Sequence, residues 1–183
     1  MRKLSQKIRS ILGDIKFRRD IQSFERVNHQ TVNFEEAQKI GLLYDATDPG
    51  NYEAVKNYVK KVRGLRKEVL ALGYVDKKEL PHNQFAQYGL DFFCRKNLDF
   101  KMTPKNTVVT NFINEKFDIL IHLNGRKIFP LRYIAALSHA KFRVGKYDRR
   151  NFFLYDLMIS VGEGSTISQF IEEAERYLKL IKK

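Results

Sequence analysis

The spacing of hydrophobic positions changes at about residue 39. From there on, short apolar runs alternate with segments whose apolar residues recur every three or four positions. Runs of the first kind predict strands, and segments of the second kind predict helices. We expect strands at residues 40–44, 69–75, 90–94, 118–123, 142–145 and 155–161. We expect helices between or after them that begin near Thr47, Pro104, Pro130 and Thr166.

This alternation predicts the fold class. Strands that alternate with helices form right-handed crossovers and a mostly parallel sheet. The run 118–123 is apolar on both faces, which is typical of a central strand, whereas the short run 142–145 is a candidate edge strand. Residues 81–89 have no clear period and are interpreted as a loop. We therefore expect an α/β, Rossmann-like three-layer sandwich of about six strands over residues 31–183.

Residues 1–30 have a different pattern, which predicts a basic amphipathic helical extension. Its apolar stripe consists of Leu4, Ile8, Ile11, Leu12 and Ile15, and cations occupy much of the rest. Gly13 weakens such a helix by about 1 kcal/mol, so a bend or break is expected there. The stripe either packs on the domain's own core or binds RNA, a protein partner or an anionic membrane surface.

Composition narrows the classes of partner. The 183 residues carry a formal net charge of +13, which makes polyanions the natural partners: RNA, DNA or an anionic membrane face. No apolar stretch approaches the roughly 20 residues of a membrane span, and no apolar signal-peptide core follows the N-terminus. Cys94 is the only cysteine, so an internal disulfide is excluded. We expect a cytoplasmic protein in which Cys94 is buried in its strand.

Three sets of basic residues are candidate nucleic-acid contacts. The helix near 51–67 carries a cationic stripe with few acids, the first helix carries a second set, and residues 143–150 carry a third. The candidates are Lys56, Lys60, Lys61, Arg63 and Lys67; Arg2, Lys3, Arg9 and Lys16; and Arg143, Lys146, Arg149 and Arg150. Tyr147, Phe152 and Phe153 are interleaved with the third set, where they either stack on bases or, more commonly, face the core.

Signals for small-ligand or catalytic chemistry are incomplete. Gly162, Gly164, Ser165 and Thr166 lie between a strand and a helix, where a loop can bind phosphate, but a plain turn followed by a capping box explains them as well. Asp45 and Asp48 follow the first strand, and Asp48 is also a natural helix cap. The four histidines share no metal-ligand spacing, and His122 is interpreted as a core residue with satisfied polar atoms. We expect no catalytic residues, no metal and no cofactor.

Two resemblances involve the stretch FDILIHLN at 117–124 and FPLRYIAALSHAKFRVG at 129–145. This stretch, together with YDLMI at 155–159, resembles a family of small proteins of unknown function from Bacteroidetes-type bacteria. The same stretch is similar to the N-terminal half of heptosyltransferase-like glycosyltransferases, which implies a Rossmann-like fold. The Gly-Asp loop of those enzymes is absent from residues 43–49, so their chemistry does not carry over.

The expected function is therefore non-catalytic binding, most simply docking on RNA or on a ribonucleoprotein such as the ribosome. A small Rossmann-like transferase or nucleotide-binding enzyme is the alternative, using strand ends near Asp45, Asn124 and Gly162. A peripheral membrane protein held by the first helix is a second alternative.

Overall fold

The structure is a computed structural model that describes residues 2–25, 29–81, 89–123 and 128–182, with the side chains of residues 2–7 left out. Six strands form one sheet: β1 (Lys39–Asp45), β2 (Glu68–Val75), β3 (Leu90–Cys94), β4 (Ile119–His122), β5 (Phe142–Lys146) and β6 (Leu157–Ile159). The helices are α1 (Arg2–Gln22), α2 (Pro49–Gly64), α3 (Thr107–Asn114), α4 (Phe129–Leu137) and α5 (Ile167–Leu180). Two short 3₁₀ turns are η1 (Arg95–Asn97) and η2 (Arg149–Asn151).

All strand pairs are parallel, and the strand order is β3-β2-β1-β4-β5-β6. This is the order of the doubly wound Rossmann sheet, in which the direction of strand addition reverses between β1 and β4. The predicted α/β class is thus confirmed. The prediction of an edge strand at 142–145 is wrong, because β5 pairs with β4 on one side and β6 on the other. Most of the predicted loop at 81–89 lies outside the described residues.

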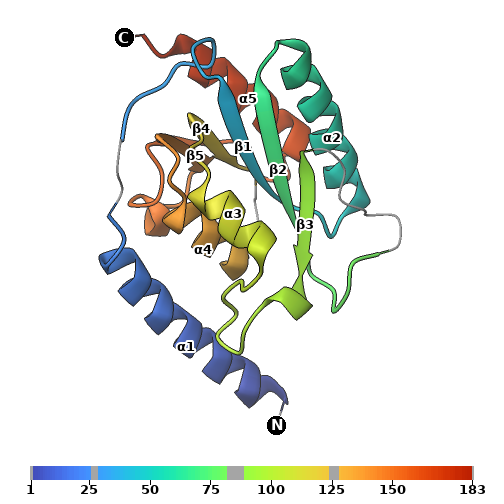
Figure 1. Cartoon of the computed structure of the whole chain (residues 1–183), viewed down its shortest axis with the longest axis vertical. Helices are drawn as coiled ribbons and strands as arrows, with labels where there is room; N and C mark the ends of the chain where they lie inside the picture. The colour runs from blue at the N-terminus through green and yellow to red at the C-terminus, as the bar shows by residue number, and fades with distance from the viewer. Residues whose placement is uncertain (1, 26–28, 82–88, 124–127, 183) are drawn as a thin grey trace.

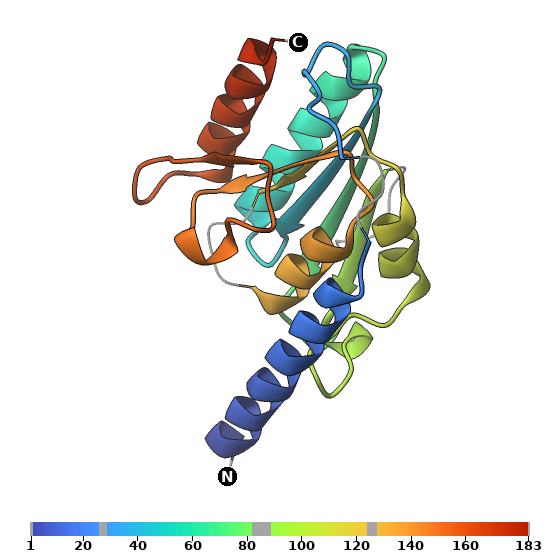
Figure 2. The same cartoon turned by 90° about the vertical axis from the view of Figure 1, so that its left-hand side faces the viewer.

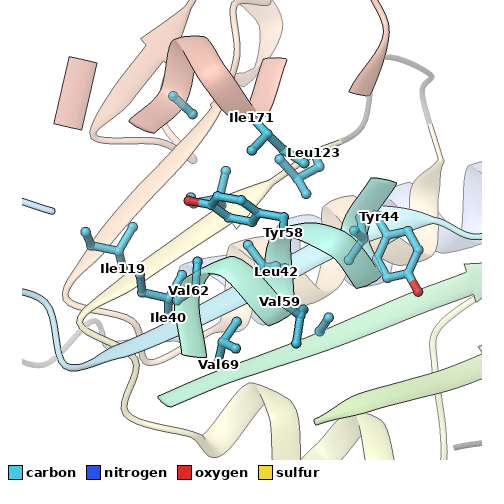
Figure 3. Packing of buried hydrophobic residues seen from close by; sticks show 14 of the residues in the cluster. Ile40, Leu42, Tyr44, Tyr58, Val59, Val62, Val69, Ile119, Leu123 and Ile171 are labelled. Atoms are coloured by element: carbon cyan, nitrogen blue, oxygen red, sulfur yellow. The ribbon is translucent and has the colours of Figure 1, made fainter. Parts of the chain in front are cut away.

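Helices cover both faces of the sheet (Figure 1). The alternation of side chains along β1 directs Ile40 and Leu42 to the face under α2 and α5, and Leu43 to the face under α3 and α4. Figure 3 shows Val59 and Val62 of α2 in the first of these layers. The core therefore has two apolar layers, with the parallel sheet buried between them.

Local capping explains where three helices begin. Asp48 accepts a hydrogen bond from Gly50 N at the start of α2, and Thr166 forms the predicted capping box with Gln169 at the start of α5. The helix expected near Pro104 begins later, because the Asn106 side chain accepts from Val109 N and caps α3. Pro104 instead pairs with Leu98 in an isolated antiparallel bridge.

The first helix packs on α4 rather than on the sheet, and it extends away from α5 (Figure 2). Phe17 is 2% exposed and contacts the rings of Phe129 and Tyr133. The helix continues through Gly13, so the expected break is absent. A Cβ at Gly13 would lie 2.7 Å from the Lys101 carbonyl oxygen, so glycine here permits close packing.

Most of the predicted apolar stripe of α1 does not reach the core. Ile8, Ile11 and Ile15 are 46%, 51% and 60% exposed, respectively. The helix therefore binds the domain through its Phe17 side and leaves an apolar stripe in solvent. Within the described part of the chain, no helix is long and apolar enough to cross a membrane.

Candidate nucleic-acid interface

A cleft of about 1200 Å³ opens at the carboxyl ends of β4 and β5, between α1, α4 and η2. We call it the basic cleft. Among the described residues that line it, five side chains are basic and two are acidic: Arg18, Arg132, Lys146, Arg149 and Arg150 against Asp14 and Asp148. The cations come from α1, α4 and the β5–η2 segment, so the fold collects charge from three separate parts of the sequence.

His122 and Tyr155 form the wall of the cleft at the end of β4. His122 ends β4 on the α4 face and is 6% exposed. Its Nδ1 lies 2.6 Å from the Tyr155 hydroxyl, whereas its Nε2 is buried and has no hydrogen-bond partner among the described residues. Burial lowers the pKa of His122 to about 4, so the imidazole is neutral at physiological pH. The expectation of a core histidine with satisfied polar atoms is therefore only half confirmed.

Arg132 projects from the first turn of α4 into the same cleft. Its guanidinium carbon lies 4.4 Å from the centre of the Phe17 ring. Its Nε is buried and finds no hydrogen-bond partner in the described part of the chain. Burial lowers the pKa of Arg132, and the nearby charge of Asp14 opposes that shift. A cation held on an aromatic face, with no ion pair to it among the described residues, is suited to receive an anion.

The outer wall of the cleft combines exposed aromatic rings with cations. Tyr147 and Phe153 are each 50% exposed, and neighbouring Phe152 is 68% exposed. The expectation that these rings more commonly face the core is wrong here. Both η2 arginines, Arg149 and Arg150, are exposed beside them, and Arg150 also pairs with Asp148 at 3.2 Å.

The structure places the third predicted basic set in two environments. Lys146, Arg149 and Arg150 line the basic cleft as a group. Arg143 is 4% exposed, and its guanidinium donates to the Ser138 carbonyl and lies over the Phe24 ring. Arg143 therefore has a structural role in β5 and does not lie on the cleft surface.

The predicted stripe on α2 is largely engaged within the molecule. Lys67 is 9% exposed and donates to the carbonyls of Glu35 and Ala37. Lys61 pairs with Glu175 of α5 at 2.8 Å, and Lys56 pairs with Glu53 at 3.7 Å.

The other two cations of the predicted α2 stripe are Arg63 and Lys60. Arg63 is partly buried and packs against Gly89, while Lys60 is exposed. α2 ends at Gly64, so Lys67 lies beyond the helix, and the predicted stripe does not form one free cationic face.

The first helix contributes to the cleft through a residue outside the predicted set. Arg18 lines the cleft, whereas Arg9 donates to the Phe100 carbonyl and Lys16 binds Asp20 and the Tyr133 hydroxyl. The side chains of Arg2 and Lys3 lie outside the described residues.

A second cleft of about 660 Å³ lies on the other face, between the carboxyl ends of β1 and β4. We call it the switch-point cleft. The predicted phosphate-binding residues Gly164, Ser165 and Thr166 line it. They form a closed turn, in which the Ser165 amide and hydroxyl donate to the Gly162 carbonyl and Gly164 has a positive φ of 79°. The Ser165 donors are therefore bonded within the turn itself.

The acids of the switch-point cleft are also engaged by the backbone. Asp45 accepts from Thr47 N, and Asp48 accepts from Gly50 N. In the part of the chain that the structure describes, no group of three or more His, Cys, Asp or Glu side chains could hold a metal ion. Cys94 is buried, as expected, and donates to the Lys78 carbonyl. Asn124 lies outside the described residues.

Sequence analysis missed Arg132, Arg18 and Tyr155 as members of one site. Arg132 is the only cation in the otherwise apolar helix FPLRYIAAL, which is the one local signal that could have identified it. Arg18 and Tyr155 join it only because α1 packs on α4 and Tyr155 packs over β5. Those contacts are long-range and have no periodic signature.

Comparison with known proteins adds a family but no activity. No curated protein matches the chain. The model of a family of unknown function, DUF6913, matches residues 11–181, which include every described strand and the second half of α1. The chain therefore belongs to the family of unknown function DUF6913.

Proposed function

We propose that the chain binds single-stranded RNA in the basic cleft without catalysis, in the cytoplasm and as part of a ribonucleoprotein such as the ribosome. The observation that carries this proposal is the convergence of cations from α1, α4 and η2 on one cleft with exposed aromatic rings at its outer wall. Cations bind the phosphates, and exposed rings stack on unpaired bases.

The size and the charge of the basic cleft favour an RNA strand over a small molecule as its ligand. Pockets for small ligands usually measure about 300–1000 Å³ and are mainly apolar. The basic cleft is larger, at about 1200 Å³, and it is rich in charge. Ser10, Gln22 and Asn151 also line it and can bond to the 2′-hydroxyl groups that distinguish RNA from DNA.

The direct test is fluorescence anisotropy with a short labelled single-stranded RNA. We expect affinity to fall steeply as salt rises from about 50 to about 200 mM, because phosphate contacts release counter-ions. The double variant Arg149→Glu/Arg150→Glu should weaken binding by more than about tenfold.

A matched control variant separates the effect of the basic cleft on RNA affinity from the effect of net charge. Lys60→Glu/Lys116→Glu makes the same charge change at two exposed residues near the amino-terminal edge of the sheet, away from the cleft. It should retain near-native affinity. Equal losses in the two double variants, or equal affinity for double-stranded and single-stranded RNA, would contradict the proposal.

The second candidate is a small nucleotide-binding protein or transferase. One observation favours it: the switch-point cleft lies where sheets of this strand order bind dinucleotides. A thermal-shift screen with nucleotides and sugar nucleotides tests it. Stabilisation above about 2 kcal/mol at near-saturating ligand, lost on Asp45→Asn but kept in the η2 double variant, would support this candidate.

A further inference from the structure

The wall of the basic cleft contains buried polar groups that the described residues do not satisfy. Arg132 Nε and His122 Nε2 are both buried and without a partner there. The first turn of α4 adds to them, because its N-cap residue Ile128 has no side chain that can cap it. Ile128, Arg132 and His122 all line the same cleft. Buried polar groups in native proteins are usually bonded, so two unbonded groups on the wall of one cleft call for an explanation, and a bound ligand would supply one.

The hydrogen bond of His122 decides which kind of atom it offers. If the Tyr155 hydroxyl donates to Nδ1, the neutral ring carries its proton on Nε2. The opposite arrangement would leave the hydroxyl proton without an acceptor among the described residues. The first arrangement satisfies more groups, so Nε2 is a donor. Arg132 can only donate. The site therefore offers donors and a positive charge.

The ligand that matches is a dianion with several acceptor oxygens. A phosphate monoester carries about −1.5 to −2 charges at pH 7 and three acceptor oxygens, whereas a phosphodiester inside a strand carries about one negative charge. Phe153 at the outer wall is 50% exposed and His122 is 6% exposed, so His122 lies toward the inside of the cleft. A phosphate at the end of an RNA strand can reach such a position, because the RNA does not have to continue beyond it.

We propose that Arg132, His122 and the first turn of α4 form an inner subsite for a phosphate monoester, which in an RNA ligand is the terminal phosphate. The inference rests on the proposed function for the identity of the strand, but the subsite itself would also take the phosphate of a mononucleotide. Tyr155 is a positioning residue that fixes the imidazole proton on Nε2.

The test compares one RNA sequence with a 5′-phosphate, a 3′-phosphate or hydroxyl groups at both ends, by competition anisotropy on the full chain. A fourth RNA, longer by one nucleotide and without a terminal phosphate, controls for added charge. We expect one phosphorylated form to bind at least about tenfold more tightly than the hydroxyl form. The longer RNA should gain much less.

Variants assign that preference to the subsite. Arg132→Gln should remove it, and Arg132→Lys should restore only part of it, because lysine keeps the charge but loses the planar fork. Lys60→Gln, with the same charge change on α2, should keep it. A Tyr155→Phe chain should lose part of the preference for the phosphorylated RNA, because the imidazole proton is then no longer fixed on Nε2.

Failure of the two proposals can be distinguished. If all four RNAs bind the wild-type chain equally, the subsite is wrong and RNA binding stands. If no RNA binds, but inorganic phosphate or a mononucleotide stabilises the wild-type chain and not Arg132→Gln, the RNA proposal is wrong and the subsite stands. If neither RNA nor phosphate binds, both are wrong.

Discussion

At the residue scale, Gly145 allows the contact between His122 and Tyr155. A Cβ at Gly145 would lie 2.7 Å from ring atoms of Tyr155, well inside van der Waals contact. The Tyr155 ring therefore approaches the β5 backbone this closely only because residue 145 has no side chain. The position of Tyr155 and its hydrogen bond with the His122 imidazole both depend on this close approach.

Gly145→Ala should therefore destabilise the protein by about 1–3 kcal/mol, through overpacking against the Tyr155 ring. Urea unfolding measures this change. Gly64→Ala is the control, since nothing lies within 4 Å of its Cβ position at the end of α2. It should leave the free energy of unfolding unchanged or raise it slightly. Equal effects of the two changes would contradict the packing described for Tyr155.

The buried imidazole also predicts a pH dependence of stability. The ordinary pKa of histidine is 6.5, and burial lowers that of His122 to about 4. Between these values the unfolded chain binds more protons than the folded chain. The free energy of unfolding should therefore fall as pH drops from about 6.5 to about 4, by up to about 3 kcal/mol from this residue.

His122→Phe removes that contribution, while the carboxylates that titrate at lower pH remain. Urea unfolding at about pH 7 and about pH 4.5 should show a smaller pH effect in the variant than in the wild-type chain. The same pH effect in both proteins would mean that His122 is not buried as a neutral ring.

At the element scale, α1 is attached to the domain through one side. Phe17 is 2% exposed between Phe129 and Tyr133, and its ring also carries the guanidinium of Arg132. Ile11, on the other side of the helix, is 51% exposed. The helix therefore both buries apolar area and supports a cation of the basic cleft.

Truncation at these two positions should give opposite results. Phe17→Ala should cost about 3–5 kcal/mol of unfolding free energy, or detach α1, and should also weaken RNA binding because Arg132 loses its support. Ile11→Ala should stay within about 0.5 kcal/mol of the wild-type stability and bind RNA normally. Chemical denaturation and anisotropy of the same preparations test both. Similar losses at Phe17 and Ile11 would contradict this attachment of α1.

At the scale of the whole molecule, the sequence predicts what local patterns determine. The apolar run 118–123 predicted β4, and Asp48 before Pro49 predicted the start of α2, because both signals lie within a few residues. The predicted start of α3 near Pro104 was wrong, because the Asn106 cap outweighs the proline signal. The sheet order was not predicted, since pairing of distant strands leaves no short-range pattern.

The basic cleft could be predicted only in part, for the same reason. Arg149 and Arg150 were identified by their charge, but Arg132 and Arg18 join them through tertiary packing. Charge counting also overvalued Lys67 and Arg143, which are buried and bonded to backbone carbonyls. A basic residue is therefore a candidate RNA contact only when its contacts within the protein leave it available to a ligand.

The most direct test of RNA binding in the basic cleft is photo-cross-linking. A single-stranded RNA carrying 4-thiouridine is irradiated with the full chain, and the cross-linked peptides are identified by mass spectrometry. We predict cross-links at Tyr147, Phe152 or Phe153 that disappear in Arg149→Glu/Arg150→Glu. Cross-links concentrated instead on Tyr177 of α5, which is 40% exposed and outside the cleft, would contradict the account.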